Sequence, residues 1–176
     1  MKLTSKFLFL PIILILFSFI GCQQQHDLEK ITSQVNKMND IMTKAVLEND
    51  SEIVLTMYTE DGISMPSYQP MIKGLEALKK HNENQPPMNM KTFSLTSTDI
   101  WASGNFVVDI GTYDLSMEMP DAPGGEWADH GKYLTLFEIQ KDGSLLMKAE
   151  TWNTDTNPWM DMMQHEGNKD DVESKM

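Results

Sequence analysis

The stretch that decides the fold is GKYLTLFEIQKDGSLLMKAETWNTD, residues 131–155. It holds two runs of alternating apolar and polar residues on either side of the turn Lys141-Asp142-Gly143. Two such runs joined by a short glycine-containing link are typical of a β-hairpin. Similar runs precede this pair, so an antiparallel β-meander is expected over residues 90–102, 106–118, 127–140 and 145–153.

The part of the chain before this meander has the pattern of helices. Apolar residues recur at spacings of three and four over residues 28–45, which predicts an amphipathic helix. Shorter helices are expected at residues 53–58 and 74–84, with a short strand at 62–67 between them. Helices followed by consecutive strands predict a single α+β domain over residues 27–155.

Composition excludes several classes of partner. The 176 residues include 26 acidic side chains against 14 lysines, with no arginine, and the net charge is −12. Nucleic-acid binding requires a basic surface, so no nucleic-acid partner is expected. No glycine-rich phosphate loop and no HExxH metal pair is present. We therefore expect no cofactor.

The N-terminus, MKLTSKFLFLPIILILFSFIGC (residues 1–22), has the layout of a secretion signal. Two lysines precede an apolar run over residues 7–20, which is shorter than the roughly 20 residues of a membrane span. The Gly21-Cys22 ending resembles a bacterial lipobox, which implies cleavage before Cys22 and a lipid on its sulfur. The alternatives are an ordinary signal peptide with an incidental cysteine, or a short membrane helix.

Lipidation would decide where the protein resides. Residues 1–21 would be removed as a lipoprotein signal peptide, and residues 22–26 would form a short lipidated tether. We therefore expect a lipid-anchored protein of the cell envelope. Gln23 follows the cysteine in place of the Asp that resembles an inner-membrane retention signal, so the outer membrane is expected, facing the periplasm or the cell surface. The acidic, methionine-rich residues 156–176 are expected to form a mostly disordered tail.

The order of these segments resembles the nuclear transport factor 2-like superfamily, also called SnoaL-like or ketosteroid-isomerase-like, and in particular its uncharacterised secreted members. Besides residues 131–155, the resemblance rests on LENDSEIVLTMYTEDGISMP (47–66), IKGLEALKK (72–80) and VVDIGTYDL (107–115). It implies a curved antiparallel sheet wrapped around three N-terminal helices, with a cone-shaped cavity that holds an active site or a small ligand. It also implies a homodimer formed through the sheet.

Strand alternation indicates which side chains would face that cavity. Asp109, Gly111 and Tyr113 share one face of their strand, as do Glu150 and Trp152 of the last strand. A partly buried carboxylate with a raised pKa is a good general base. The catalytic candidates are therefore Asp109, Glu150 and His130, and the ligand-binding candidates are Tyr58, Tyr113, Tyr133, Trp152 and Asn153.

Each candidate has an alternative role. The carboxylates could lie on the solvated face, the aromatic residues could be plain core, and His130 could be a rim residue beside Asp129. Ketosteroid isomerase chemistry is not expected, since members with that activity carry a base Asp where this chain has Met65 before Pro66. Resemblance in fold does not carry the reaction with it.

Three hypotheses for function follow. The leading one is a lipid-anchored, extracytoplasmic domain that binds a small molecule, with weak acid–base or hydrolytic activity left open. The second is a periplasmic copper-handling protein, because thioether sulfur suits soft metals. The third is a non-catalytic, dimerising interaction module. The copper ligands would be the tail residues Met160, Met162, Met163 and His165.

Overall fold

The structure is a computed structural model that describes residues 27–86, 88–120 and 122–157. The predicted signal peptide (1–21), the tether with Cys22 and nearly all of the predicted tail lie outside these residues. Within the described part, no helix has both the length and the apolar character needed to span a membrane.

All three expected helices are present. Helix α1 (Leu28–Leu47) begins at Asp27, whose side chain accepts a hydrogen bond from the backbone N–H of Lys30 at 3.2 Å. Such a cap satisfies one of the free N–H groups of the first turn. Helix α2 (Ser51–Thr56) is capped in the same way by Asp50, and helix α3 (Leu75–Glu83) follows.

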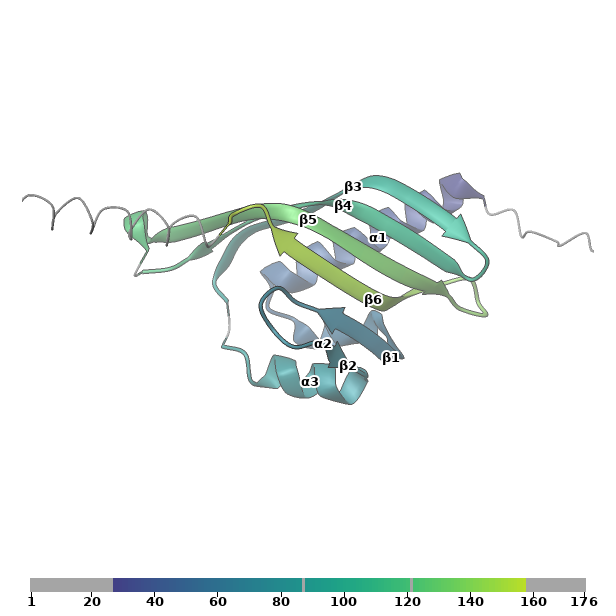
Figure 1. The fold of residues 1–176 in the computed structure, drawn as a ribbon, viewed down its shortest axis with the longest axis horizontal. Coiled ribbons are helices and arrows are strands. Elements are labelled where there is room, and N and C mark those ends of the chain that lie inside the picture. Colours follow the sequence, from purple (N-terminus) through teal and green to yellow (C-terminus); the bar gives the residue numbers. More distant parts are fainter. Residues whose placement is uncertain (1–26, 87, 121, 158–176) are drawn as a thin grey trace, which may run out of the picture.

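The strands form one curved, six-stranded sheet in the order β2-β1-β6-β5-β4-β3. The expected meander is confirmed, with boundaries close to those predicted. Helix α1 lies across one face of the sheet, and α2, α3, β1 and β2 gather beyond its β6 side (Figure 1). The strands are β1 (Tyr58–Met65), β2 (Ile72–Lys73), β3 (Met90–Ser103), β4 (Phe106–Glu118), β5 (Glu126–Ile139) and β6 (Leu145–Thr154).

Two details of the expected architecture are wrong. The sheet is mixed, because β1 pairs in parallel with β6. Tyr58 starts β1 instead of ending the second helix, since the backbone N–H of Met147 bonds the carbonyl of Met57 at 2.7 Å and draws the chain into the sheet there. The two-residue strand β2, which pairs with β1, was not predicted.

A β-bulge in β6 decides which side chains face inward. Phe137 pairs with Met147 but Leu136 pairs with Ala149, so Lys148 is the extra residue. Met147 and Glu150 therefore face the same side of the sheet, although strict alternation would separate them. Bulges commonly redirect side chains in this way.

The hydrophobic core lies between the helices and the inner face of the sheet. Ile31 and Val35, from the N-terminal half of α1, belong to a cluster with Val107, Phe137 and Leu145 at the β5–β6 turn end of the sheet. The C-terminal half of α1 instead faces the part of the sheet that extends toward the β4–β5 hairpin. On the outer face of the sheet, three large apolar side chains are exposed: Trp101 (58%), Phe106 (42%) and Leu134 (38%).

Two glycines allow tyrosine rings to lie close against the sheet. Gly111 of β4 is paired with Tyr133 of β5, and Tyr113 is paired with Gly131. A Cβ at Gly111 would lie 2.2 Å from the carbonyl oxygen of Thr96 and 2.6 Å from the Tyr133 hydroxyl, which is far below contact distance. Each glycine thus makes room for the ring opposite it.

We predict that Gly111→Ala lowers the free energy of unfolding by about 1–3 kcal/mol, because the added methyl group overpacks the site. The neighbouring Thr112 is exposed on the outer face, so Thr112→Ala should stay within about 0.5 kcal/mol of the parent. Urea unfolding followed by circular dichroism measures both. Equal stability of the two variants would contradict the close approach of Tyr133 to Gly111.

Candidate functional site

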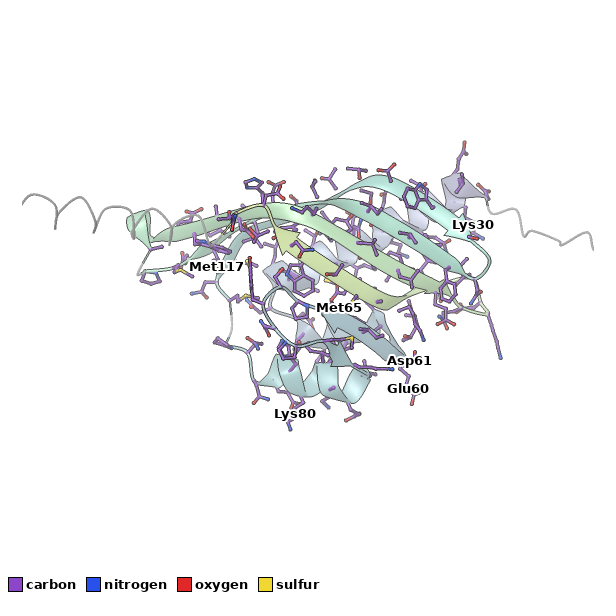
Figure 2. All side chains as sticks on the ribbon, in the orientation of Figure 1. Lys30, Glu60, Asp61, Met65, Lys80 and Met117 are labelled. Carbon is purple, nitrogen blue, oxygen red and sulfur yellow. The ribbon has the colours of Figure 1, made fainter. Side chains whose placement is uncertain are left out.

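A cavity of about 460 Å³ lies between the C-terminal half of α1, α3 and the inner face of the sheet. Its wall is mostly apolar and is rich in methionine and aromatic side chains. Gln69, Met88 and Trp127 are exposed lining residues and mark its mouth. The lining methionines are Met38, Met42, Met57, Met88, Met90, Met117 and Met147, of which Figure 2 labels Met117. The lining aromatic residues are Tyr58, Phe93, Tyr113, Trp127, Tyr133, Phe137 and Trp152.

Glu150 is one of two carboxylates that line this cavity, the other being Asp129. Its Oε1 accepts hydrogen bonds from the hydroxyl of Tyr58 and from the hydroxyl of Ser64, the latter at 3.0 Å. No described residue donates a hydrogen bond to Oε2. This oxygen is not fully buried either, and because Glu150 lines the cavity, Oε2 is open to it. Burial raises the pKa of Glu150, and the bonds from Tyr58 and Ser64 only partly oppose this rise.

Two further tyrosine–carboxylate pairs come from a repeated sequence pattern. The pattern Asp-x-Gly-x-Tyr occurs at 109–113 on β4 and again at 129–133 on β5. Because the strands are antiparallel, each tyrosine reaches the aspartate of the other strand. Tyr133 donates to Oδ2 of Asp109 at 2.9 Å, and Tyr113 donates to Oδ2 of Asp129 at 2.8 Å.

Asp109 lies behind the cavity wall and is fully buried. Its Oδ2 also accepts a hydrogen bond at 3.1 Å from Asn39, which lines the cavity together with Tyr133. Its Oδ1 has no partner among the described residues. Burial raises the pKa of Tyr133 to about 12, and the charge of Asp109 adds to the rise. Asp109 can therefore position Asn39 and Tyr133 but does not itself reach the cavity.

Asp129 reaches the cavity wall directly. Its Oδ1 accepts from the hydroxyl of Thr154 at 2.5 Å, so both of its oxygens are bonded. Burial raises the pKa of Tyr113, and the bond to Asp129 raises it further. This aspartate is thus held rigidly, in contrast to Glu150 with its open oxygen.

The structure brings together most of the residues singled out in the sequence. Glu150, Tyr58, Tyr113, Tyr133 and Trp152 line the cavity.

His130 and Asn153 do not reach the cavity, because they alternate with inward-facing neighbours on β5 and β6. Asn153 is exposed opposite Lys132, and His130 is exposed, with its Nε2 lying 4.0 Å from Asp155.

The alternative metal ligands cannot be placed in the same way. Met160, Met162, Met163 and His165 lie outside the described residues. Within residues 27–86, 88–120 and 122–157, no group of three or more histidine, cysteine, aspartate or glutamate side chains could hold a metal ion.

Three site residues were not singled out as candidates: Asn39, Ser64 and Asp129. The repeated Asp-x-Gly-x-Tyr pattern was a sequence signal for Asp129. Asn39 stands beside the apolar stripe of α1, between Met38 and Met42, where a polar residue is unusual. Nothing in the sequence marks Ser64, because its role follows from the pairing of β1 with β6.

We predict that Glu150→Gln gains stability relative to the parent as pH rises. The folded protein raises the pKa of Glu150 above its unfolded value of about 4.3, so the folded state binds more protons above that pH. The free energy of unfolding of the parent then falls as pH rises through this window, and glutamine lacks the proton. Urea unfolding at about pH 5 and about pH 8 tests this. A difference between variant and parent that does not change with pH would contradict it.

We compared the chain with known proteins by sequence and by structure. No protein-family model matches the chain, and no curated protein matches it in sequence. Solved structures do match it in fold. A ketosteroid isomerase-like protein from Erwinia carotovora atroseptica has a TM-score of 0.62 at 15% identity, covering 76% of this chain and 99% of that one.

Two further structures agree. A nuclear transport factor 2-like superfamily protein from Salmonella enterica serovar Typhimurium has a TM-score of 0.57 at 10% identity, covering 74% of this chain and 92% of that one. A protein from Catenulispora acidiphila, solved in complex with S-DNPA, has a TM-score of 0.57 at 16% identity, covering 72% and 95%. The chain therefore has the nuclear transport factor 2-like fold, as its sequence resemblance implied.

Proposed function

We propose that this protein is a lipid-anchored, extracytoplasmic domain that binds a small, largely apolar molecule in the cavity beneath the sheet. The observation that carries the proposal is the cavity itself. Its volume of about 460 Å³ falls within the roughly 300–1,000 Å³ of small-molecule sites. Its wall is mainly apolar, with a few convergent polar groups around Glu150, which is the usual composition of such a site.

The composition of the wall supports binding over a purely structural role. Methionine side chains are flexible and polarisable, so they adapt to irregular apolar ligands. A module that only mediates dimerisation would have no need of an unfilled, apolar volume under its sheet. The Catenulispora protein of the same fold was solved as a complex with S-DNPA, which is consistent with ligand binding by this fold.

Glu150 supports a second candidate function, slow acid–base or hydrolytic chemistry on the bound molecule. Its open Oε2 faces the cavity and its pKa is raised, which are the properties required of a general acid or base. The hydroxyl of Tyr58 beside it would orient the carboxylate. The repeated tyrosine–aspartate pairs would then hold the rest of the wall in place.

The proposed location rests on the sequence of residues 1–22. An anchor on Cys22 with a tether of residues 22–26 would hold the domain close to the membrane surface. The exposed Trp101, Phe106 and Leu134 on the outer face support pairing of two copies through the sheet. Copper handling by the tail remains an alternative.

We predict that the neutral fluorophore N-phenyl-1-naphthylamine binds in the cavity and gains fluorescence. Leu95 lines the cavity, whereas Thr96 points to the outer face of the same strand. Leu95→Trp fills the space and should weaken binding by about tenfold or more, while Thr96→Trp should leave it within about threefold. Thermal melts establish that both variants fold. Equal binding by both variants, or no binding by the parent, would refute the cavity as a ligand site.

A separate prediction concerns the anchor. When the full chain is expressed in bacteria supplied with labelled palmitate, the parent should incorporate the label and Cys22→Ser should not, because Cys22 is the only cysteine. Immunoprecipitation followed by detection of the label measures this. An unlabelled parent would remove the lipid anchor from the proposal and leave the cavity untouched.

A further inference from the structure

We propose that the cavity is selective for organic ammonium ions, that is, apolar molecules carrying one positively charged nitrogen, and that Oε2 of Glu150 binds that nitrogen. This inference rests on the proposed ligand-binding function and names the class of ligand. It follows from three features of the cavity: its charges, the open oxygen, and the aromatic side chains around it.

The charges around the cavity are unbalanced. Two carboxylates, Glu150 and Asp129, line it, and Asp109 lies directly behind the wall. None of the described lysines lines it, and the chain has no arginine. Lys30 and Lys80 lie at the outer surface (Figure 2). Among the described lining residues, His81 is the only basic side chain.

Most of the lysines near the sheet are already paired at the surface. Lys148 bonds Asp61 and lies 3.7 Å from Glu138, while Lys132 bonds Asp155 and Lys91 bonds Glu126 at 3.0 Å. These lysines therefore have partners away from the cavity. They therefore do not supply a positive charge to Glu150, and a cationic ligand could supply it.

Glu150 offers a ready acceptor for such a charge. Tyr58 and Ser64 both donate to Oε1, which fixes the carboxylate and leaves Oε2 directed at the cavity. An ammonium has N–H donors and no acceptor, so it matches an open carboxylate oxygen, and charge-assisted bonds of this kind are the strong ones. A carboxylate in a ligand would face like charges and find no described lysine.

Aromatic side chains line the same cavity. Trp152 lies on the same face as Glu150, two residues further along β6, and pairs across the strands with Tyr133. Together with Tyr58, whose hydroxyl bonds Oε1 of Glu150, these rings line the cavity that Oε2 faces. A cation within about 6 Å of such ring faces is stabilised further, most strongly by tryptophan. The apolar remainder of the ligand would pack against the methionines.

The test uses three probes that share one carbon skeleton and differ in charge: 4-phenylbutylammonium, 4-phenylbutan-1-ol and 4-phenylbutanoate. Their affinities are measured by displacement of N-phenyl-1-naphthylamine. In the parent, we expect the ammonium to bind about tenfold more tightly than the alcohol, and the carboxylate to bind more weakly than the alcohol. Equal affinity for all three would overturn the inference and leave the proposed function standing.

Two variants locate the selectivity. Glu150→Gln should abolish the advantage of the ammonium over the alcohol, measured as the ratio of the two affinities. Asp114→Asn makes the same change in charge on the exposed outer face of β4 and should preserve the advantage. Selectivity that survives in Glu150→Gln would rule out Glu150 as the anchor. If Glu150→Gln does not fold, the three affinities of the parent still decide. Failure of the parent to bind the fluorophore would instead contradict the proposed function.

Discussion

The constraint on which the site depends is the burial of carboxylates without a cation. Each of the three carboxylates in or directly behind the cavity wall accepts a hydrogen bond from a tyrosine hydroxyl and has no ion-pair partner among the described residues. Burying a carboxylate is costly unless hydrogen bonds replace its water. The phenols supply those bonds but not a compensating charge. Burial raises the pKa values of Glu150 and of the three tyrosines, and the neighbouring carboxylate adds to the rise in each tyrosine. The pairs are Tyr58–Glu150, Tyr133–Asp109 and Tyr113–Asp129.

The backbone is arranged to make those pairs possible. Gly111 and Gly131 leave space for the tyrosine rings of the facing strand, and the antiparallel register brings each hydroxyl to an aspartate. In β6 the bulge at Lys148 turns Glu150 inward, where the parallel strand β1 presents Tyr58 and Ser64. The strand pairing, the bulge and the two glycines thus position the three tyrosine–carboxylate pairs. The pairing and the bulge also leave Oε2 of Glu150 open to the cavity.

Much of this fold could be predicted because its signals are local. The alternation of apolar and polar residues and the glycine-containing turns gave the four long strands close to their observed ends. The helical spacing of α1 was equally clear, although Leu28, at its start, is exposed. The parallel position of β1 depends on contacts with β6, far along the chain, and no local pattern reveals it. Tyr58 was misplaced for this reason.

The candidate site was predictable to a similar extent. Face-sharing along a strand correctly grouped Glu150 with Trp152, and the same alternation places Asn153 and His130 on the outer face, opposite to Trp152 and Tyr133. Asn39 had only a weak signal, its polar side chain beside the apolar stripe of α1, and Ser64 had none because its partner lies far along the chain. The most direct measurement is a high-resolution structure of the protein purified from the cells that produce it. The account predicts density in the cavity with a nitrogen at hydrogen-bonding distance from Oε2 of Glu150. A cavity filled by its own side chains, or Glu150 turned to bulk solvent, would contradict it.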